Sequence, residues 1–402
     1  MMPDLDTVAE TLNKSPMFHM SLGSRELFHS NFIGWLFSSY PETVSCLGLM
    51  INEPFVVRRE KKSVDLVLEH TGSGSPLGII ENKFKDVPKR EQLEKYGTRF
   101  PDTQRAVLTL LPSSFEVSEL NWDEVLYRHF AQNLSAWLAL NCDVSTRDKT
   151  FISSYCEMTM AISEIVESVL GVGDDVDTYW YGVSRADIAR LGNIRFLDTI
   201  LKHFANRMAW DVEKAVRHAF PELIVNPEGR QRSLLRSEGR IFCQVWSALF
   251  NKQPCVALDL HHWIDGRQFN LTVQVQGNQY RRLIDCDNFD IPEGKALARK
   301  TFDVKSLIDQ SDSYQWLFGP GAERGHVSVP SWGHTGRSEF ETSMRVPFGT
   351  YAPKAIYQYV TVSMGKLKPE MLVGCILSDV ELGLRLLNDS DYVQRFRELR
   401  QQ

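Results

Sequence analysis

Residues 63 to 84 read SVDLVLEHTGSGSPLGIIENKF, and this stretch decides the fold of the first part of the chain. Two apolar runs flank residues 71–76, whose Gly, Ser and Pro content is typical of a hairpin loop. Each run is short and rich in Val, Leu and Ile, which favours strands over helices. We therefore predict two strands, over 63–69 and 77–84, that pair across this loop.

The elements on either side extend the hairpin into a larger layered structure. A helix is predicted over 24–38, where Ser24 can cap the first turn and apolar residues recur at three- and four-residue spacing. A strand over 55–60 follows it. Beyond the hairpin, a helix over 89–100 precedes a strand over 106–111. This α-β-β-β-α-β order predicts an α/β sandwich.

The rest of the chain contains more helices and then a run of strands. The further elements that we predict are helices over 131–140, 148–170 and 184–219, strands over 241–246, 256–262, 269–276 and 356–362, and helices over 293–309 and 379–400. Residues 171–175 are Gly- and Asp-rich, which predicts a linker, and 319–336 has the composition of a surface loop.

Length and composition set the domain count and the compartment. A chain of 402 residues exceeds the usual size of a single core, so we expect an α/β core over 1–145, a helical connector over 146–220 and an α+β domain over 221–402. The seven cysteines are scattered and never spaced as C-x-x-C, which favours a reducing, cytoplasmic location. An acidic N-terminus and the lack of a long apolar run predict no secretion signal and no membrane partner.

Three charged residues of the hairpin are the candidate catalytic group. If paired residues have numbers that sum to 147 or 148, Asp65 lies across from Asn82 or Lys83. Side chains alternate along a strand, so Glu81 and Lys83 share a face, and Asp65 joins them in the second of these registers.

Two neighbouring carboxylates on apolar strands repel each other unless something neutralises them. Mg²⁺, or Mn²⁺ in its place, prefers oxygen ligands of this kind, and Lys83 would then assist an attacking water and stabilise charge on a phosphate. These residues therefore predict hydrolysis of a phosphodiester bond. The alternative is an ordinary cross-strand ion pair among Asp65, Glu81 and Lys83.

The surrounding motifs resemble a known superfamily. Asp65 in a strand, Ile79-Ile80-Glu81-Asn82-Lys83 in the next, and Gln92-Leu93-Glu94-Lys95-Tyr96 in a helix resemble the core of the PD-(D/E)XK nucleases. The opening helix, residues 26–36, resembles the first helix of a prokaryotic subset with an I-E-N-K strand. The resemblance covers about residues 20–112 and implies a restriction-endonuclease-like core.

The resemblance also implies roles for individual residues. Asp65, Glu81, Glu26 and the carbonyl of Asn82 would bind the metal ion, and Lys83 would be the catalytic lysine. Gln92 and Tyr96 would support the site and the end of the DNA. The helix dipole alone also favours a glutamate at 26, and an amphipathic helix alone would explain 92 and 96. Val64 stands where the family often has proline.

Basic residues flank the acidic pair and could contact nucleic acid. They are Arg58, Arg59, Lys61, Lys62, Lys85, Lys89 and Arg90. A solvated surface is the alternative, because the net charge of −6 gives no overall attraction to nucleic acid.

We expect a Mg²⁺-dependent deoxyribonuclease, acting on DNA rather than RNA, with a role in phage defence suggested by the resemblance. Its partners would be a second copy of the chain or proteins of a multi-gene system. The alternative is a module that binds nucleic acid or protein without cleaving it.

Overall fold

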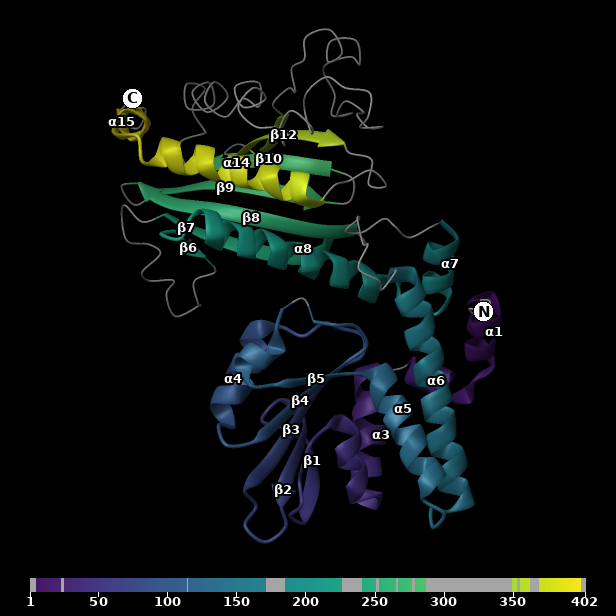
Figure 1. Cartoon of the computed structure of the whole chain (residues 1–402). Coiled ribbons are helices and arrows are strands. Elements are labelled where there is room, and N and C mark those ends of the chain that lie inside the picture. The colour runs from purple at the N-terminus through teal and green to yellow at the C-terminus, as the bar shows by residue number, and fades with distance from the viewer. Residues whose placement is uncertain are drawn as a thin grey trace. The chain divides into compact units, whose positions relative to one another are not determined.

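A computed structural model describes residues 5–22, 25–113, 115–170, 185–225, 241–250, 253–264, 267–276, 279–286, 349–352, 355–361 and 369–398. Over these residues the chain is a mixed α/β protein with two mixed sheets (Figure 1). It divides into two compact units: unit 1 comprises Met1–Asp175 and Val183–His203, and unit 2 comprises Val176–Gly182 and Phe204–Gln402. The helices expected as a connector over 146–220 are divided between the two units.

Unit 1 contains one sheet and most of the helices that the structure describes. Its strands are β1 (Phe55–Lys61), β2 (Val64–His70), β3 (Pro76–Lys83), β4 (Gln104–Thr109) and β5 (Asp123–Leu126). Its helices are α1 (Leu5–Lys14), α2 (Pro16–Ser21), α3 (Arg25–Ser39), α4 (Arg90–Arg99), α5 (Tyr127–Leu140), α6 (Thr146–Leu170) and α7 (Arg185–Asn193), with short 3₁₀ helices η1 (Pro41–Leu47) and η2 (Val117–Leu120). Helix α8 (Leu197–Ala219) begins in unit 1.

The sheet of unit 1 has the order β1-β2-β3-β4-β5, with antiparallel pairs up to β3 and parallel pairs from β3 onward. Helix α4 lies on one side of it, and α3 and α5 lie on the other (Figure 1). Because both faces are covered, β3 is buried from Gly78 to Lys83, and its apolar run is continuous rather than alternating.

The predicted α-β-β-β-α-β order is confirmed as α3, β1, β2, β3, α4 and β4, each within two residues of its predicted bounds. The predicted cap Ser24 lies outside the described residues. The predicted pairing register is wrong. Leu66 pairs with Ile80 and Leu68 with Gly78, so paired numbers sum to 146, and a bulge lies between Leu68 and Glu69. This register brings Asp65 opposite Glu81, where side chains again share a face.

The turn between β1 and β2 has an unusual backbone. Lys62 and Ser63 connect the pair Lys61 and Val64, and their φ angles are +52° and +68°. Two left-handed residues in a two-residue hairpin match the twist of the flanking strands. The turn thereby directs the Ser63 carbonyl toward α4, where Tyr96 donates to it.

The single helix predicted over 184–219 is wrong, because the structure has α7 and α8 with a break between them. Arg195 adopts the left-handed conformation (φ +58°), and the Phe196 N–H donates to the Leu191 carbonyl at 2.8 Å. This is the Schellman arrangement that ends a helix. It allows both Ile194 and Phe196 to be fully buried.

Unit 2 contains the second sheet, in the order β11-β12-β10-β9-β8-β7-β6. Its strands are β6 (Ile224–Val225), β7 (Ile241–Phe250), β8 (Gln253–Ile264), β9 (Arg267–Gln276), β10 (Gln279–Cys286), β11 (Gly349–Ala352) and β12 (Ala355–Thr361). The four predicted strands of this region are confirmed as β7, β8, β9 and β12. Helix α14 (Pro369–Leu387) packs closely on β8 and β9, since a Cβ added at Gly383 would meet the Leu260 side chain at 2.6 Å.

The C-terminal helix predicted over 379–400 is instead two helices, α14 and α15 (Ser390–Glu398). Asp389 accepts a hydrogen bond from the Asp391 N–H at 2.9 Å and so starts the second helix. The predicted linker 171–175, helix 293–309 and loop 319–336 lie outside the described residues. Among the residues that are described, no helix is both long and apolar enough to span a bilayer.

Candidate functional site

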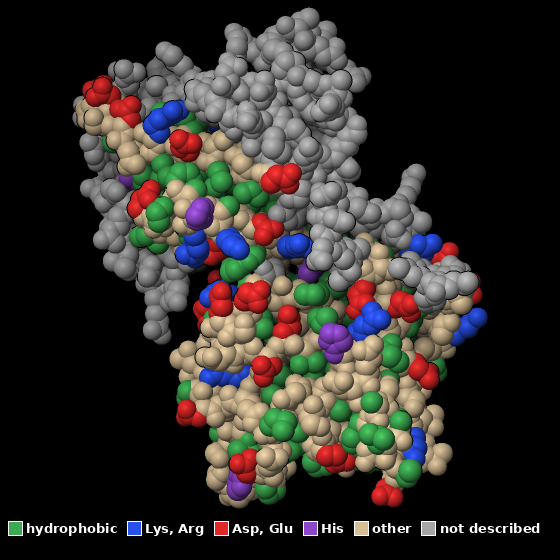
Figure 2. Space-filling model, in the orientation of Figure 1, with side chains coloured by type: hydrophobic (Ala, Val, Ile, Leu, Met, Phe, Trp, Pro, Cys, Tyr) green, Lys and Arg blue, Asp and Glu red, His purple; other side chains and the backbone are tan. Residues whose placement is uncertain are grey.

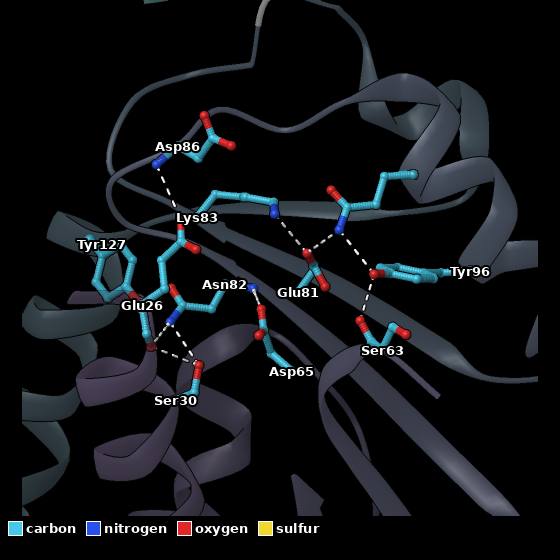
Figure 3. Close-up of polar contacts among 11 residues, drawn as sticks. Glu26, Ser30, Ser63, Asp65, Glu81, Asn82, Lys83, Asp86, Tyr96 and Tyr127 are labelled. Carbon is cyan, nitrogen blue, oxygen red and sulfur yellow. Dashed lines mark hydrogen bonds and ion pairs between the residues drawn. The ribbon is translucent and has the colours of Figure 1, made fainter. Parts of the chain in front are cut away.

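One face of the β2–β3 pair carries the three charged side chains predicted from the sequence. Asp65 of β2 and Glu81 and Lys83 of β3 lie in one cluster (Figure 3). Glu81 is 2% exposed and Lys83 is 8% exposed, while Asp65 is half-buried. The Lys83 Nζ lies 2.8 Å from the Glu81 Oε1. The structure therefore brings these three groups together.

Helix α4 holds Glu81 from the other side. The Gln92 Nε2 donates to the Glu81 Oε1 at 2.8 Å and to the Tyr96 hydroxyl at 2.9 Å. The Tyr96 hydroxyl in turn donates to the Ser63 carbonyl at 2.5 Å. Residues four apart on a helix share a face, so α4 presents Gln92 and Tyr96 together. This chain of hydrogen bonds fixes one oxygen of the Glu81 carboxylate.

The other oxygen of Glu81 is left without a partner among the described residues. Its Oε2 is buried and has no hydrogen bond. A buried acceptor in this state costs about 1 to 3 kcal/mol. A cation at this position would remove that cost.

Asn82 lies between Glu81 and Lys83 and contacts residues on both faces of the sheet. Its main-chain N–H donates to the Asp65 Oδ2 at 2.7 Å. Its Nδ2 donates to the Glu26 carbonyl at 2.9 Å and to the Ser30 Oγ at 3.0 Å, and its Oδ1 accepts from the Tyr127 hydroxyl. Asn82 is thus in contact with strand β2 and with helices α3 and α5.

Glu26 comes to the same cluster from the first turn of α3. It is half-buried, and its Oε1 accepts a hydrogen bond from the Asp86 N–H at 3.2 Å. Asp86 lies in the loop after β3 and pairs with Lys202 at 3.3 Å. The carboxylates of Glu26, Asp65 and Glu81 thus lie near Lys83, whose ammonium group contacts Glu81 (Figure 3).

The pKa values express this excess of negative charge. Burial, and then repulsion by Asp65, raises the pKa of Glu81 to about 7. Burial also raises the pKa values of Asp65 and Glu26. Burial alone would lower the pKa of Lys83, but the combined attraction of Glu81, Glu26 and Asp65 outweighs burial and raises the pKa. Lys83 is therefore protonated at neutral pH, whereas Glu81 is only partly ionised.

The donor set has the chemistry that Mg²⁺ requires. Mg²⁺ is usually bound in proteins by one or two carboxylates and completes its octahedron with water and substrate oxygens. Asp65 and Glu81 provide two carboxylates, and the Glu81 Oε2 has no competing hydrogen bond. No group of three His, Cys, Asp or Glu side chains suited to a metal ion occurs in the part of the chain that the structure describes. Asp65 and Glu81 are therefore the two carboxylates that the described site offers to a cation.

Four of the seven predicted basic residues have partners within the chain. Arg58 and Lys61 both pair with Glu69, and Arg90 pairs with Glu94 and Glu119 at 3.0 Å each. Lys62 lies 5.3 Å from the centre of the Phe100 ring.

The other predicted basic residues are Arg59, Lys85 and Lys89, and all three are exposed. The stem of Arg59 packs beside Gly34 of α3. On the face of unit 1 drawn in Figure 2, acidic and basic side chains are interspersed. Contact with nucleic acid through the seven basic residues remains a prediction.

Sequence reasoning missed Ser30, Ser63, Asp86 and Tyr127. Ser63 and Asp86 act through main-chain atoms, so no side-chain pattern could identify them. Tyr127 is 45 residues from its partner Asn82. Ser30 follows Glu26 by one helical turn, and this spacing was the only available signal.

Comparisons with known proteins found no significant match to a protein-family model, to a curated protein or to a solved structure.

Proposed function

We propose that this chain is a Mg²⁺-dependent nuclease of the PD-(D/E)XK type that hydrolyses DNA phosphodiester bonds. The observation that carries the proposal is the meeting of Asp65, Glu81 and Lys83 on one buried face, with the Glu81 Oε2 unpartnered. The α-β-β-β-α-β order of unit 1, which the resemblance requires, supports it. A role in phage defence follows only from the resemblance.

The cation would be held by Asp65 and Glu81, with the Asn82 carbonyl as a further oxygen donor and the Glu26 carboxylate acting through a bound water. When bound, it would supply the positive charge that activates water and polarises the phosphate. The protein contributes the arrangement of its ligands. Asp65 is fixed by a main-chain N–H and Glu81 by Gln92, so neither carboxylate has to be ordered when the ion binds.

Lys83 would stabilise the charge that grows on the phosphate. Its raised pKa keeps the ammonium group protonated at neutral pH, which favours electrostatic stabilisation and proton donation over proton abstraction. The Glu81 contact holds the amine at the edge of the ligand cluster. Tyr96 and Gln92 act indirectly, because they hold Glu81 rather than a reacting atom.

The test is cleavage of single- and double-stranded DNA with Mg²⁺ or Mn²⁺, compared with a chelator. Lys83→Ala and Asp65→Ala should each lower the rate by about 100- to 1,000-fold. Lys95→Ala is the matched control, because Lys95 is an exposed lysine on α4, and its rate should stay within about twofold of wild type. Equal rates for wild type, Lys83→Ala and Asp65→Ala would refute the proposal.

The alternative of a module that binds without cleaving is favoured by one contact. The Lys83 ammonium already lies against Glu81 and neutralises part of the cluster without a cation. Calorimetric titration with Mg²⁺ and Mn²⁺ separates the two functions. A nuclease of this type should bind the ion in the absence of DNA, whereas a pure binding module has no need for it.

A further inference from the structure

Each donor hydrogen and the acceptor oxygen of the Asn82 side chain has a hydrogen-bond partner. Asn82 is 0% exposed, and strand alternation places its side chain on the opposite face from Glu81 and Lys83. Its two amide hydrogens go to the Glu26 carbonyl and the Ser30 Oγ, and its carbonyl oxygen accepts from Tyr127. A primary amide has two donor hydrogens and one acceptor oxygen, and each is occupied here.

These bonds tie the first turn of α3 to β3. The Ser30 Oγ also donates to the Glu26 carbonyl at 2.9 Å, so Asn82, Ser30 and Glu26 form a closed triangle at the start of the helix (Figure 3). The Glu26 carboxylate projects from the residue whose carbonyl is held in this way. Its distance from Asp65 and Glu81 is therefore set through Asn82.

The same residue acts on the other face through its backbone. The Asn82 N–H holds Asp65, and its chain neighbours are Glu81 and Lys83. We propose that Asn82 is a positioning residue: its side chain places the helix that carries Glu26 beside Asp65 and Glu81, and so sets how tightly this site holds a divalent cation. This inference rests on the proposed function and assigns to the Asn82 amide a role beyond that of its carbonyl.

The test is the affinity for Mn²⁺ alone, measured by calorimetry on the full chain. Asn82→Ala removes the amide but keeps the N–H that holds Asp65, and should weaken Mn²⁺ binding by about 10- to 100-fold. Thr43→Val is the matched control, because the buried Thr43 hydroxyl donates to the Tyr40 carbonyl at 2.6 Å elsewhere in unit 1. It should lower the melting temperature without weakening Mn²⁺ binding.

A double-mutant cycle with Glu26→Gln shows whether Asn82 acts through Glu26. In that background Asn82→Ala should weaken Mn²⁺ binding by less than about threefold. An undiminished loss would overturn the inference, as would wild-type affinity in Asn82→Ala. If Asn82→Ala does not fold, Ser30→Ala and Tyr127→Phe replace it, and each should weaken binding several-fold, whereas wild-type affinity in both would overturn the inference.

The failure of this inference differs from the failure of the proposed function. If the wild-type chain binds no Mn²⁺ and cleaves no DNA, the nuclease proposal is wrong and the positioning role falls with it. If wild type binds and cleaves while Asn82→Ala binds equally well, only the positioning role is wrong.

Discussion

Each unit buries a carboxylate beside a cation, and the two surroundings differ. In unit 2 the Asp379 Oδ1 lies 2.5 Å from the Arg282 Nε, and its Oδ2 accepts from the Tyr280 hydroxyl at 2.9 Å. Both of its oxygens are occupied, and one negative charge meets one positive charge. In unit 1, Glu81 shares a single lysine with two other carboxylates and keeps one buried oxygen without a bond.

The difference distinguishes a carboxylate with both oxygens bonded from one that keeps an oxygen open to a further ligand. Both oxygens of the Asp379 carboxylate are bonded, and its charge is matched by that of Arg282. The Glu81 cluster carries an unbalanced charge that the fold itself does not neutralise. Buried groups with perturbed pKa values are common at functional sites for this reason.

The largest effect on stability should come from breaking the Arg282–Asp379 pair. Asp379→Leu leaves Arg282 buried without its carboxylate and should lower the free energy of unfolding by about 3 to 5 kcal/mol. Urea denaturation measures the loss, and Asp391→Asn on the exposed start of α15 is the control. Adding Arg282→Met should restore most of the stability. A single variant as stable as wild type would show that the pair is not needed.

The next largest effect is stabilisation by Mg²⁺, which should depend on the cluster around Glu81 and not on Asp379. Mg²⁺ at 100 times its dissociation constant should stabilise the wild-type chain by about 2.7 kcal/mol. Asp65→Asn should lose most of this gain, while Asp379→Leu should keep it. Thermal unfolding with and without the ion provides the measurement, and equal stabilisation of Asp65→Asn would argue against a site at this position.

A pH titration separates the two regions further. The pKa of Glu81 rises from 4.5 to about 7 on folding, so between these values the folded state holds a proton that the unfolded chain has lost. Its stabilising contribution is complete below pH 4.5 and is lost as the pH rises to 7, by up to about 1.4 kcal/mol per unit.

Glu81→Gln should remove this slope from unfolding curves recorded in a chelator, and Glu91→Gln, on the exposed face of α4, should not. Saturating Mg²⁺ should flatten the wild-type curve, because the ion stabilises the charged carboxylate. An unchanged slope in Glu81→Gln would mean that Glu81 titrates normally.

The smallest effect should come from removing the Tyr96 hydroxyl, which holds Glu81 indirectly through Gln92. Tyr96→Phe removes the donor to the Ser63 carbonyl and should cost about 1 kcal/mol of stability. The cleavage rate should fall by several-fold rather than abolishing activity, since Gln92 keeps its bond to Glu81. A rate as low as that of Lys83→Ala would place Tyr96 in contact with the substrate instead.

Much of unit 1 could be predicted from the sequence because its signals are local. The hairpin loop, the apolar runs and the amphipathic helices identified β2, β3, α3 and α4, and with them the face shared by Asp65, Glu81 and Lys83. The register could not be predicted, because Pro76 belongs to β3 rather than to the loop, so that Glu69 pairs with Pro76. A bulge after Leu68 then changes the sum of paired numbers from 145 to 146.

The break between α7 and α8 and the ion pairs of β1 depend on tertiary contacts, which cannot be read from the sequence. Arg195 is an ordinary residue in a left-handed position, and only the burial of Phe196 explains why the helix ends there. The pairing of Arg58 and Lys61 with Glu69 likewise depends on strand geometry, which the basic run in the sequence does not show.

The left-handed turn at Lys62 and Ser63 has a consequence for how the site can vary. The Tyr96 hydroxyl bonds to the main-chain carbonyl of Ser63, not to a side chain. Position 63 is therefore free to change among residues that tolerate such a backbone, such as Gly, Asn or Asp, while the anchor persists. An anchor of this kind would be missed by any search that looks for invariant side chains.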